Sequence, residues 1–179
     1  QQNIVKTQIV FNDKVEMRNL TFNYPNTVTP SLRDVNIVVR KGETVGFIGP
    51  SGAGKSTLVD VILGLLPQTS GELLIDGVEM QEHNLEWQST IGYVSQAIYL
   101  TDDTVRRNVA FGISEKDVDE VALERALKSA QLWDFVDGLP NKTHTIVGER
   151  GVRVSGGQRQ RIDIARALYH EPQVLVLDE

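Results

Sequence analysis

The residue types and spacing best suited to chemistry occur in the run Gly49-Pro-Ser-Gly-Ala-Gly-Lys-Ser56, which has the pattern of a phosphate-binding P-loop. Its glycines let the backbone wrap around a polyphosphate, and the helix expected to begin at Gly54 adds a favourable dipole. Lys55 is expected to reach the β- and γ-phosphates of a nucleotide and to act in catalysis, and the Ser56 hydroxyl to coordinate Mg²⁺. The alternative, a glycine-rich turn before an ordinary helix, is disfavoured because the run lies between a predicted strand and a predicted helix. The predicted nucleotide-binding residues of this run are Gly49, Pro50, Ser51, Gly52, Ala53, Gly54, Lys55, Ser56 and Thr57.

A second candidate group is the apolar run of residues 174–177 followed by Asp178 and Glu179. A buried strand of this kind delivers carboxylates to the edge of an α/β sheet where ligands bind. Asp178 is expected to hold Mg²⁺, directly or through water, and Glu179 to polarise the attacking water as a catalytic residue. An apolar run ending in Asp-Glu is often only structural, but downstream of a P-loop the catalytic interpretation is favoured.

The elements that must position these groups alternate along the chain. We expect helices over residues 54–66, within 104–138 and over 155–170, and strands over residues 15–22 (with a slip before Leu20), 35–39, 44–48, 72–75, 91–94 and 174–177. This alternation predicts an α/β fold, a P-loop NTPase core with a mainly parallel sheet, an N-terminal antiparallel β part and an inserted α-helical subdomain. The almost wholly apolar residues 44–48 are expected to form a central strand covered on both faces.

The predicted elements divide the chain into four segments that form three parts. Residues 1–14 are interpreted as a linker or frayed strand, residues 15–96 and 156–179 as the nucleotide-binding core, and residues 97–155 as the helical subdomain. Because the chain lacks an initiator Met and a leader, we interpret it as a piece of something longer.

Composition excludes several classes of protein. With 40% hydrophobic and 23% charged residues, the chain has the composition of a globular domain, and its longest apolar stretch, residues 61–67, is too short to cross a bilayer. A net charge of −6 argues against a nucleic-acid partner. The chain has no cysteine, and its three histidines share no ligand spacing, so a zinc site is not expected.

A third motif, Ser155-Gly-Gly-Gln-Arg-Gln-Arg161, stands at the start of a predicted helix between the other two. Ser155 can cap this helix, and Gly156 and Gly157 leave its backbone amides accessible, which suits a second anion site better than a plain capped helix. Together with Ala165-Arg-Ala-Leu168, the motif resembles the signature of ABC ATPases. The resemblance covers roughly residues 15–179.

Membership of that family would imply further roles. Gln96 is similar to the Q-loop glutamine, which contacts Mg²⁺ and the attacking water and connects the core to the helical subdomain. Tyr24 matches the aromatic residue that stacks on adenine, and Phe22 is the weaker candidate. The resemblance implies ATP and Mg²⁺ as cofactors and a head-to-tail dimer with a second nucleotide-binding domain. Each ATP would then lie between one P-loop and the signature of the other copy, namely Ser155, Gly156, Gly157 and Gln158.

Two further stretches, residues 104–112 and 145–151, look like those of exporters and flippases. The implied function is an ATP-hydrolysing domain at the cytoplasmic face of the membrane that powers transport through attached transmembrane domains. Three residues depart from the family pattern: Ile146 stands where Glu is usual, Val154 where Leu is usual, and Asp163 where a small residue is usual.

Two alternatives remain. Family members continue beyond the equivalent of Glu179 with a D-loop and a switch histidine, so this chain is also consistent with a nucleotide-binding fragment that has little or no turnover. A soluble ABC ATPase serving DNA repair or translation is less consistent, because such proteins lack the exporter-like stretch before the signature.

Overall fold

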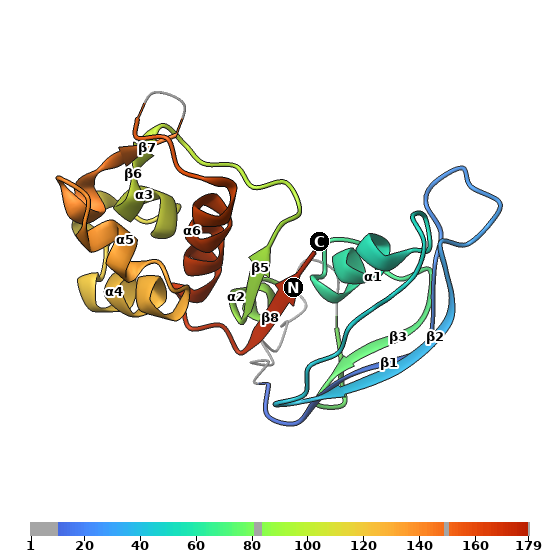
Figure 1. Cartoon of the computed structure of the whole chain (residues 1–179). Helices are drawn as coiled ribbons and strands as arrows, with labels where there is room; N and C mark the ends of the chain where they lie inside the picture. The colour runs from blue at the N-terminus through green and yellow to red at the C-terminus, as the bar shows by residue number, and fades with distance from the viewer. Residues whose placement is uncertain (1–10, 81–83, 149–150, 179) are drawn as a thin grey trace, which may run out of the picture. The chain divides into compact units, whose positions relative to one another are not determined.

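The computed structural model describes residues 11–80, 84–148 and 151–178. The chain divides into two compact units, residues 1–90 and residues 91–179, and each unit is described by itself (Figure 1). None of the helices in these described ranges has the length and apolar character needed to cross a membrane.

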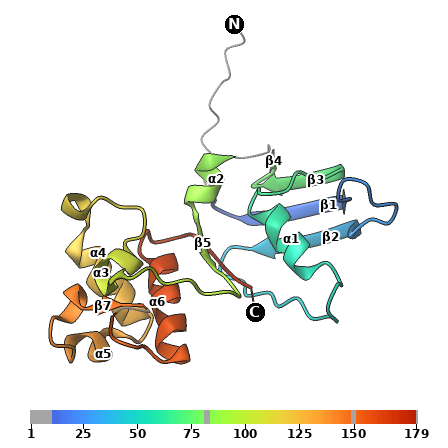
Figure 2. The same ribbon diagram turned by 90° about the horizontal axis from the view of Figure 1, so that it is seen from above.

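The first unit is built on an antiparallel sheet with the strand order β2-β1-β3-β4. Two helices accompany this sheet (Figure 2). The elements are β1 (Lys14–Phe22), β2 (Leu32–Arg40), α1 (Lys55–Ile62), β3 (Ser70–Ile75), β4 (Val78–Glu79) and α2 (Leu85–Ser89). The predicted antiparallel β part is therefore confirmed.

The slip predicted before Leu20 is present in β1. The pairing of β1 with β2 shifts register between Met17 and Leu20, and Asn19 within the shift has a φ of 46°. Without the shift, strict alternation would turn Leu20 and Phe22 away from the face that buries Met17. With it, all three side chains are at most 4% exposed. The irregularity thus keeps one continuous apolar face.

Helix α1 is shorter than predicted. Its buried residues include Leu58 and Val61, which share a face. The helix ends at Ile62 rather than residue 66, because Gly64 adopts a φ of 69° that an α-helix does not accommodate. Helix α2 packs against the end of α1 and supplies a donor to it. The fully buried Trp87 of α2 donates its indole N–H to the Ile62 carbonyl over 2.7 Å.

The second unit combines a parallel strand pair with a helical cluster (Figure 1). Its elements are β5 (Ile91–Val94), β6 (Asp103–Thr104), α3 (Val105–Val109), α4 (Glu120–Ser129), α5 (Trp133–Asp137), β7 (Ile146–Val147), α6 (Gly156–Leu168) and β8 (Val174–Leu177). Strand β5 pairs in parallel with β8, and Ile91 lies opposite Val174. Side chains from α3, α4, α5 and α6 form one apolar core.

Helix α6 lies against β5 at very short range. A Cβ placed on Gly92 would be 2.6 Å from the Ala167 carbonyl oxygen and 2.8 Å from Cγ of Pro172. Only glycine therefore allows the backbone of β5 to approach the end of α6 this closely.

The central strand expected over residues 44–48 is not formed. These described residues belong to no strand, Val45 is 44% exposed and Ile48 is fully exposed. Apolar composition predicts what a strand prefers to bury, but a strand exists only where neighbouring backbone supplies its hydrogen bonds. The strand order of the first unit, β2-β1-β3-β4, leaves this segment outside the sheet.

The expectation of a buried final strand is also corrected. Strand β8 forms where predicted, but Leu175 and Leu177 are 45% and 55% exposed. Among the described strands β8 is bonded to β5 alone, so one of its sides has no neighbour. Parallel strand pairing in the described residues is limited to this pair, which is less than the mainly parallel sheet that we expected.

Candidate functional site

The P-loop forms a tight turn that leads directly into α1. Gly52 and Gly54 adopt left-handed φ values of 80° and 86°, which glycine alone accepts without strain. The Ala53 N–H donates to the Pro50 carbonyl over 3.2 Å, and the Leu58 N–H donates to the Gly54 carbonyl over 2.8 Å. The first helical bond of α1 is therefore the one from the Leu58 N–H, and the N–H groups before it make no bond within the helix. Phosphate binding at a helix start uses N–H groups of this kind.

Gly54 is fixed by packing as well as by its backbone angles. A Cβ at this position would lie 2.6 Å from the Ser31 carbonyl oxygen and 3.1 Å from a methyl group of Leu32. The start of α1 thus rests directly on the start of β2. No larger residue fits without moving one of them.

The Lys55 ammonium folds back over the loop. It donates to the carbonyl oxygens of Gly49 and Pro50 over 2.8 Å and 3.0 Å. This places the charge beside the P-loop turn, and its contact with phosphates stays a prediction. Ser56 lies in the first turn of α1 and is exposed.

Tyr24 is attached to the same helix. Its hydroxyl is 3.2 Å from Oγ1 of the buried Thr57, and its ring meets Phe22 edge-to-face with centroids 4.9 Å apart. Tyr24 is 39% exposed, whereas Phe22 is 4% exposed. Tyr24 is therefore the more exposed of the two aromatic candidates, and its stacking on adenine stays a prediction.

The signature motif begins α6 with a complete capping box. The Ser155 hydroxyl accepts from the Gln158 N–H over 3.2 Å, and the Gln158 side chain accepts from the Ser155 N–H over 2.8 Å. Both Gly156 and Gly157 are exposed, and a Cβ on either would meet no described atom within 4 Å. The box fixes the start of the helix, and the two glycines place no side chain over it, so the predicted anion site stays a prediction.

Replacing Ser155 with Ala should lower the free energy of unfolding of the second unit by about 1 kcal/mol, because one N–H of the helix start loses its acceptor. Chemical denaturation followed by circular dichroism measures this. Ser114→Ala is the matched control, since Ser114 caps a 3₁₀ turn without a side-chain bond to any described residue. Equal losses in both variants would contradict the assignment.

Gln96 and Asp178 follow the two paired strands at the same edge. Strand β5 ends at Val94 and β8 at Leu177, and the Asp178 N–H donates to the Val94 carbonyl over 3.0 Å. Because the strands run parallel, the residues after them emerge together. Asp178 is thus bonded to the end of β5, Gln96 follows that end by two residues, and the Gln96 side chain is exposed. Glu179 lies outside the described residues.

The predicted site residues are divided between the two units. The P-loop and Tyr24 lie in the first unit, and Gln96, Ser155 to Gln158 and Asp178 lie in the second. Within the described ranges no cluster of three His, Cys, Asp or Glu residues suits a metal ion. Taken one by one, the Ser56 hydroxyl, the Gln96 side-chain amide and the Asp178 carboxylate are oxygen donors of the kind that Mg²⁺ accepts, and Mg²⁺ takes few protein ligands and completes its shell with water and phosphate oxygens.

Comparison with known proteins identifies the family. A family model described as ABC transporter matches residues 32–179. The chain belongs to the ABC transporter family. It is 43% identical over 171 residues to the ATP-dependent lipid A-core flippase of Syntrophus aciditrophicus (strain SB), covering 93% of this chain and 27% of that protein. The same-named flippase of Escherichia coli (strain K12) is 42% identical over 166 residues, covering 92% and 28%.

A solved structure supports the same fold. A bacterial Atm1-family ABC exporter with ATP bound matches with a TM-score of 0.83 and 34% identity, over 95% of this chain and 30% of that one. The chain therefore spans less than a third of the length of these relatives.

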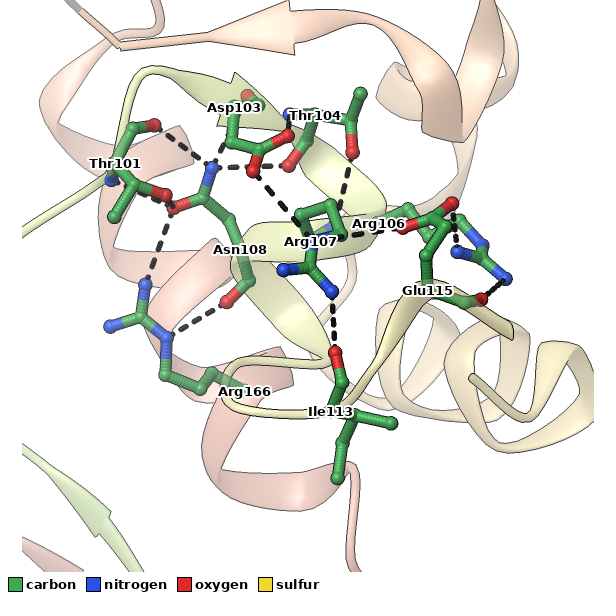
Figure 3. A network of polar contacts seen from close by, with 9 residues as sticks. All are labelled: Thr101, Asp103, Thr104, Arg106, Arg107, Asn108, Ile113, Glu115 and Arg166. Carbon is green, nitrogen blue, oxygen red and sulfur yellow. Dashed lines mark hydrogen bonds and ion pairs between the residues drawn. The ribbon is translucent and has the colours of Figure 1, made fainter. Parts of the chain in front are cut away.

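One exporter-like stretch of this ABC transporter domain is held by a polar network (Figure 3). Thr104 caps α3, its hydroxyl accepting from the Arg107 N–H over 3.1 Å. The fully buried Asn108 exchanges bonds with Thr101: its side-chain oxygen accepts from the Thr101 N–H over 3.0 Å, and its amide donates to the Thr101 carbonyl over 3.1 Å. Arg106 is paired with Glu115 and Glu120. Several polar side chains in the stretch 104–112 therefore stabilise the fold of the second unit.

Asp163 had no explanation from the sequence, whereas Arg166 belongs to the motif of residues 165–168. Asp163 is 3% exposed and ion-paired over 2.8 Å with Arg166, one turn further along α6. Arg166 also donates to the Asn108 carbonyl over 2.8 Å (Figure 3). Their i,i+3 spacing on a predicted helix was the available signal, together with the departure of Asp163 from the ABC transporter pattern.

Proposed function

We propose that this chain is the nucleotide-binding domain of an ABC exporter or flippase, which binds MgATP and hydrolyses it. The observation that carries the proposal is the P-loop geometry. The left-handed backbone of Gly54 leads directly into the start of α1. The Lys55 ammonium lies over the turn that would receive the phosphates. The similarity to flippases over more than 90% of the chain supports it.

The proposed roles follow the chemistry of each side chain. Lys55 holds the β- and γ-phosphates, and Ser56, Gln96 and Asp178 contribute oxygen atoms to Mg²⁺, which offsets phosphate charge when bound. Gln96 also orients the attacking water, and Glu179 accepts its proton. Residues 15–96 and 156–179 form the nucleotide-binding core, and residues 97–155 the helical subdomain.

Turnover is proposed to require two copies of the domain. Each ATP would be bound by the P-loop of one copy and by Ser155, Gly156, Gly157 and Gln158 of the second copy, in a head-to-tail arrangement. The capped, accessible start of α6 supports this, because exposed amides at a helix start suit a γ-phosphate. Closure on ATP and reopening after hydrolysis would drive attached transmembrane domains from the cytoplasmic face of a membrane.

Trapping the closed dimer tests this proposal. Glu179→Gln keeps the shape of the side chain but removes the base, so in the whole protein ATP should hold the two domains together. We expect chemical crosslinking of the whole protein with MgATP to join the two nucleotide-binding domains, and the double variant with Lys55→Ala to lose this crosslink. Domains that remain apart with MgATP in Glu179→Gln would count against the dimer.

The substrate class follows only from the relatives. Both flippases named above are described as acting on lipid A-core, and we propose a lipid or lipid-linked molecule as the substrate here. Stimulation of ATP hydrolysis by such lipids in reconstituted membranes, but not by peptides, would support it.

A further inference from the structure

We propose that Asp163 is a positioning residue for Gln96, tying the strand end that carries Gln96 to the helix that begins with the signature motif. The proposal rests on the role proposed above for Gln96 in hydrolysis. It gives a function to a carboxylate that stands where the family usually has a small residue.

The first link between this strand end and α6 is a hydrogen bond between residues far apart in the sequence. The Ser95 N–H, next to Gln96, donates to a carboxylate oxygen of Asp163 over 3.3 Å. Strand β5 has ended at Val94, so this amide would otherwise be free of the sheet. Asp163 is 3% exposed, which means that its carboxylate is placed by packing rather than by solvent.

Arg166 supplies a second link on the other side of Gln96. Its guanidinium donates to the Tyr99 carbonyl over 3.1 Å and is ion-paired with Asp163 over 2.8 Å. Between the two links, the Ser95 hydroxyl donates to the Ala97 carbonyl over 3.0 Å. The segment around Gln96 is therefore held by α6 before and after the glutamine, while the Gln96 side chain stays exposed.

Close packing of β5 against α6 restricts movement of the strand end that precedes Gln96. At Gly92 the backbone of β5 approaches the Ala167 carbonyl so closely that a Cβ would be 2.6 Å away. Strand β5 is thus fixed to α6 at Ala167 and, through Ser95, at Asp163. A shift of α6 would be passed to the backbone that carries Gln96, because packed elements do not slide continuously.

The carboxylate also balances a partly buried charge. Burial lowers the pKa of the Arg166 guanidinium from its usual value, and the negative charge of Asp163 opposes that change. Arg166 retains carbonyl acceptors at Asn108 and Tyr99 without Asp163. Loss of the carboxylate should therefore loosen Ser95 more than it loosens Arg166.

Four measured quantities in Asp163→Ala of the whole protein test the proposal. We expect kcat for MgATP to fall on the order of tenfold, at the lower end of the range for residues that support a catalytic ligand. The KM for ATP and the affinity for MgATP should stay near wild type, because the P-loop is unchanged. Amide hydrogen exchange at Ser95 should become faster. Glu124→Ala, which breaks the exposed pair with Lys128, is the control and should alter none of these.

Two variants separate positioning from simple stability. Asp163→Asn keeps an oxygen that can accept from Ser95 but loses the charge, so it should retain most of the activity. In a Gln96→Ala background, Asp163→Ala should lower kcat no further, since the residue that it positions is gone. Asp163→Ser provides a second truncation should the alanine variant fail to fold.

Several results would overturn the inference. They are unchanged Ser95 exchange in the truncated variants, equal losses in Asp163→Asn and Asp163→Ala, or losses that add fully to those of Gln96→Ala. A wild-type protein without Lys55-dependent hydrolysis would instead contradict the proposed function, and Ser95 exchange would still decide whether Asp163 holds the strand end.

Discussion

Replacing Lys55 with Ala is expected to lower MgATP hydrolysis by about 10²–10³-fold. The ammonium lies within 3.0 Å of two P-loop carbonyl oxygens, beside the turn that we propose to hold the β- and γ-phosphates, between which negative charge develops as the bond breaks. A bond from a charged donor to phosphate strengthens as that charge develops, so its loss slows the reaction more than it weakens binding. Phosphate release at saturating MgATP measures the change.

The control for this experiment is a lysine outside the site. Lys142→Ala removes an exposed ammonium paired with Asp137 over 2.8 Å in the second unit, and it should leave hydrolysis unchanged. Hydrolysis that survives in Lys55→Ala at the wild-type rate would show that the P-loop does not bind the reacting phosphate. Wild-type hydrolysis at background, with Lys55-sensitive binding retained, would favour the nucleotide-binding fragment without turnover.

Replacing Gly54 with Ala is expected to abolish nucleotide binding and to destabilise the first unit by about 2–4 kcal/mol. Two costs add here. Alanine is strained at a φ of 86°, and its Cβ would lie 2.6 Å from the Ser31 carbonyl oxygen. Relief of the clash requires the start of α1 to move away from β2, and the amides that receive phosphate would move with it.

Gly77→Ala separates these two costs. Gly77 has a similar φ of 81°, but a Cβ there would meet no described atom within 4 Å. This variant should lose about 1 kcal/mol from backbone strain alone and keep full nucleotide affinity. Urea denaturation and titration with a fluorescent ATP analogue measure both quantities. Similar stability losses in the two variants would show that the contact with Ser31 carries no energy.

The sequence predicted best those features whose cause is local. The tight turn before α1 depends on glycines within a few residues of each other, and the cap predicted at Ser155 forms within one turn of α6. The register shift before Leu20 was also predicted, because the alternation of apolar and polar residues changes phase there. The bounds of β5 and β8 were predicted correctly, since short apolar runs between turn residues define them.

The features that escaped prediction depend on distant partners. Residues 44–48 have the composition of a buried strand, but composition does not say whether another strand pairs with them. The contact of Asp163 with Ser95 joins residues 68 positions apart, and nothing local in either segment indicates it. The exposure of Leu175 and Leu177 likewise depends on which strands flank β8.

The chain has two tryptophans, and they fall one in each unit. Trp87 is fully buried beside the end of α1, and Trp133 is partly buried against the core of the second unit, with the Lys128 ammonium 5.4 Å from its ring centroid. Their fluorescence emission spectra therefore arise from different dielectric surroundings. With Trp133→Phe the remaining signal reports melting of the P-loop unit alone, so the cooperativity of the two units becomes an optical measurement.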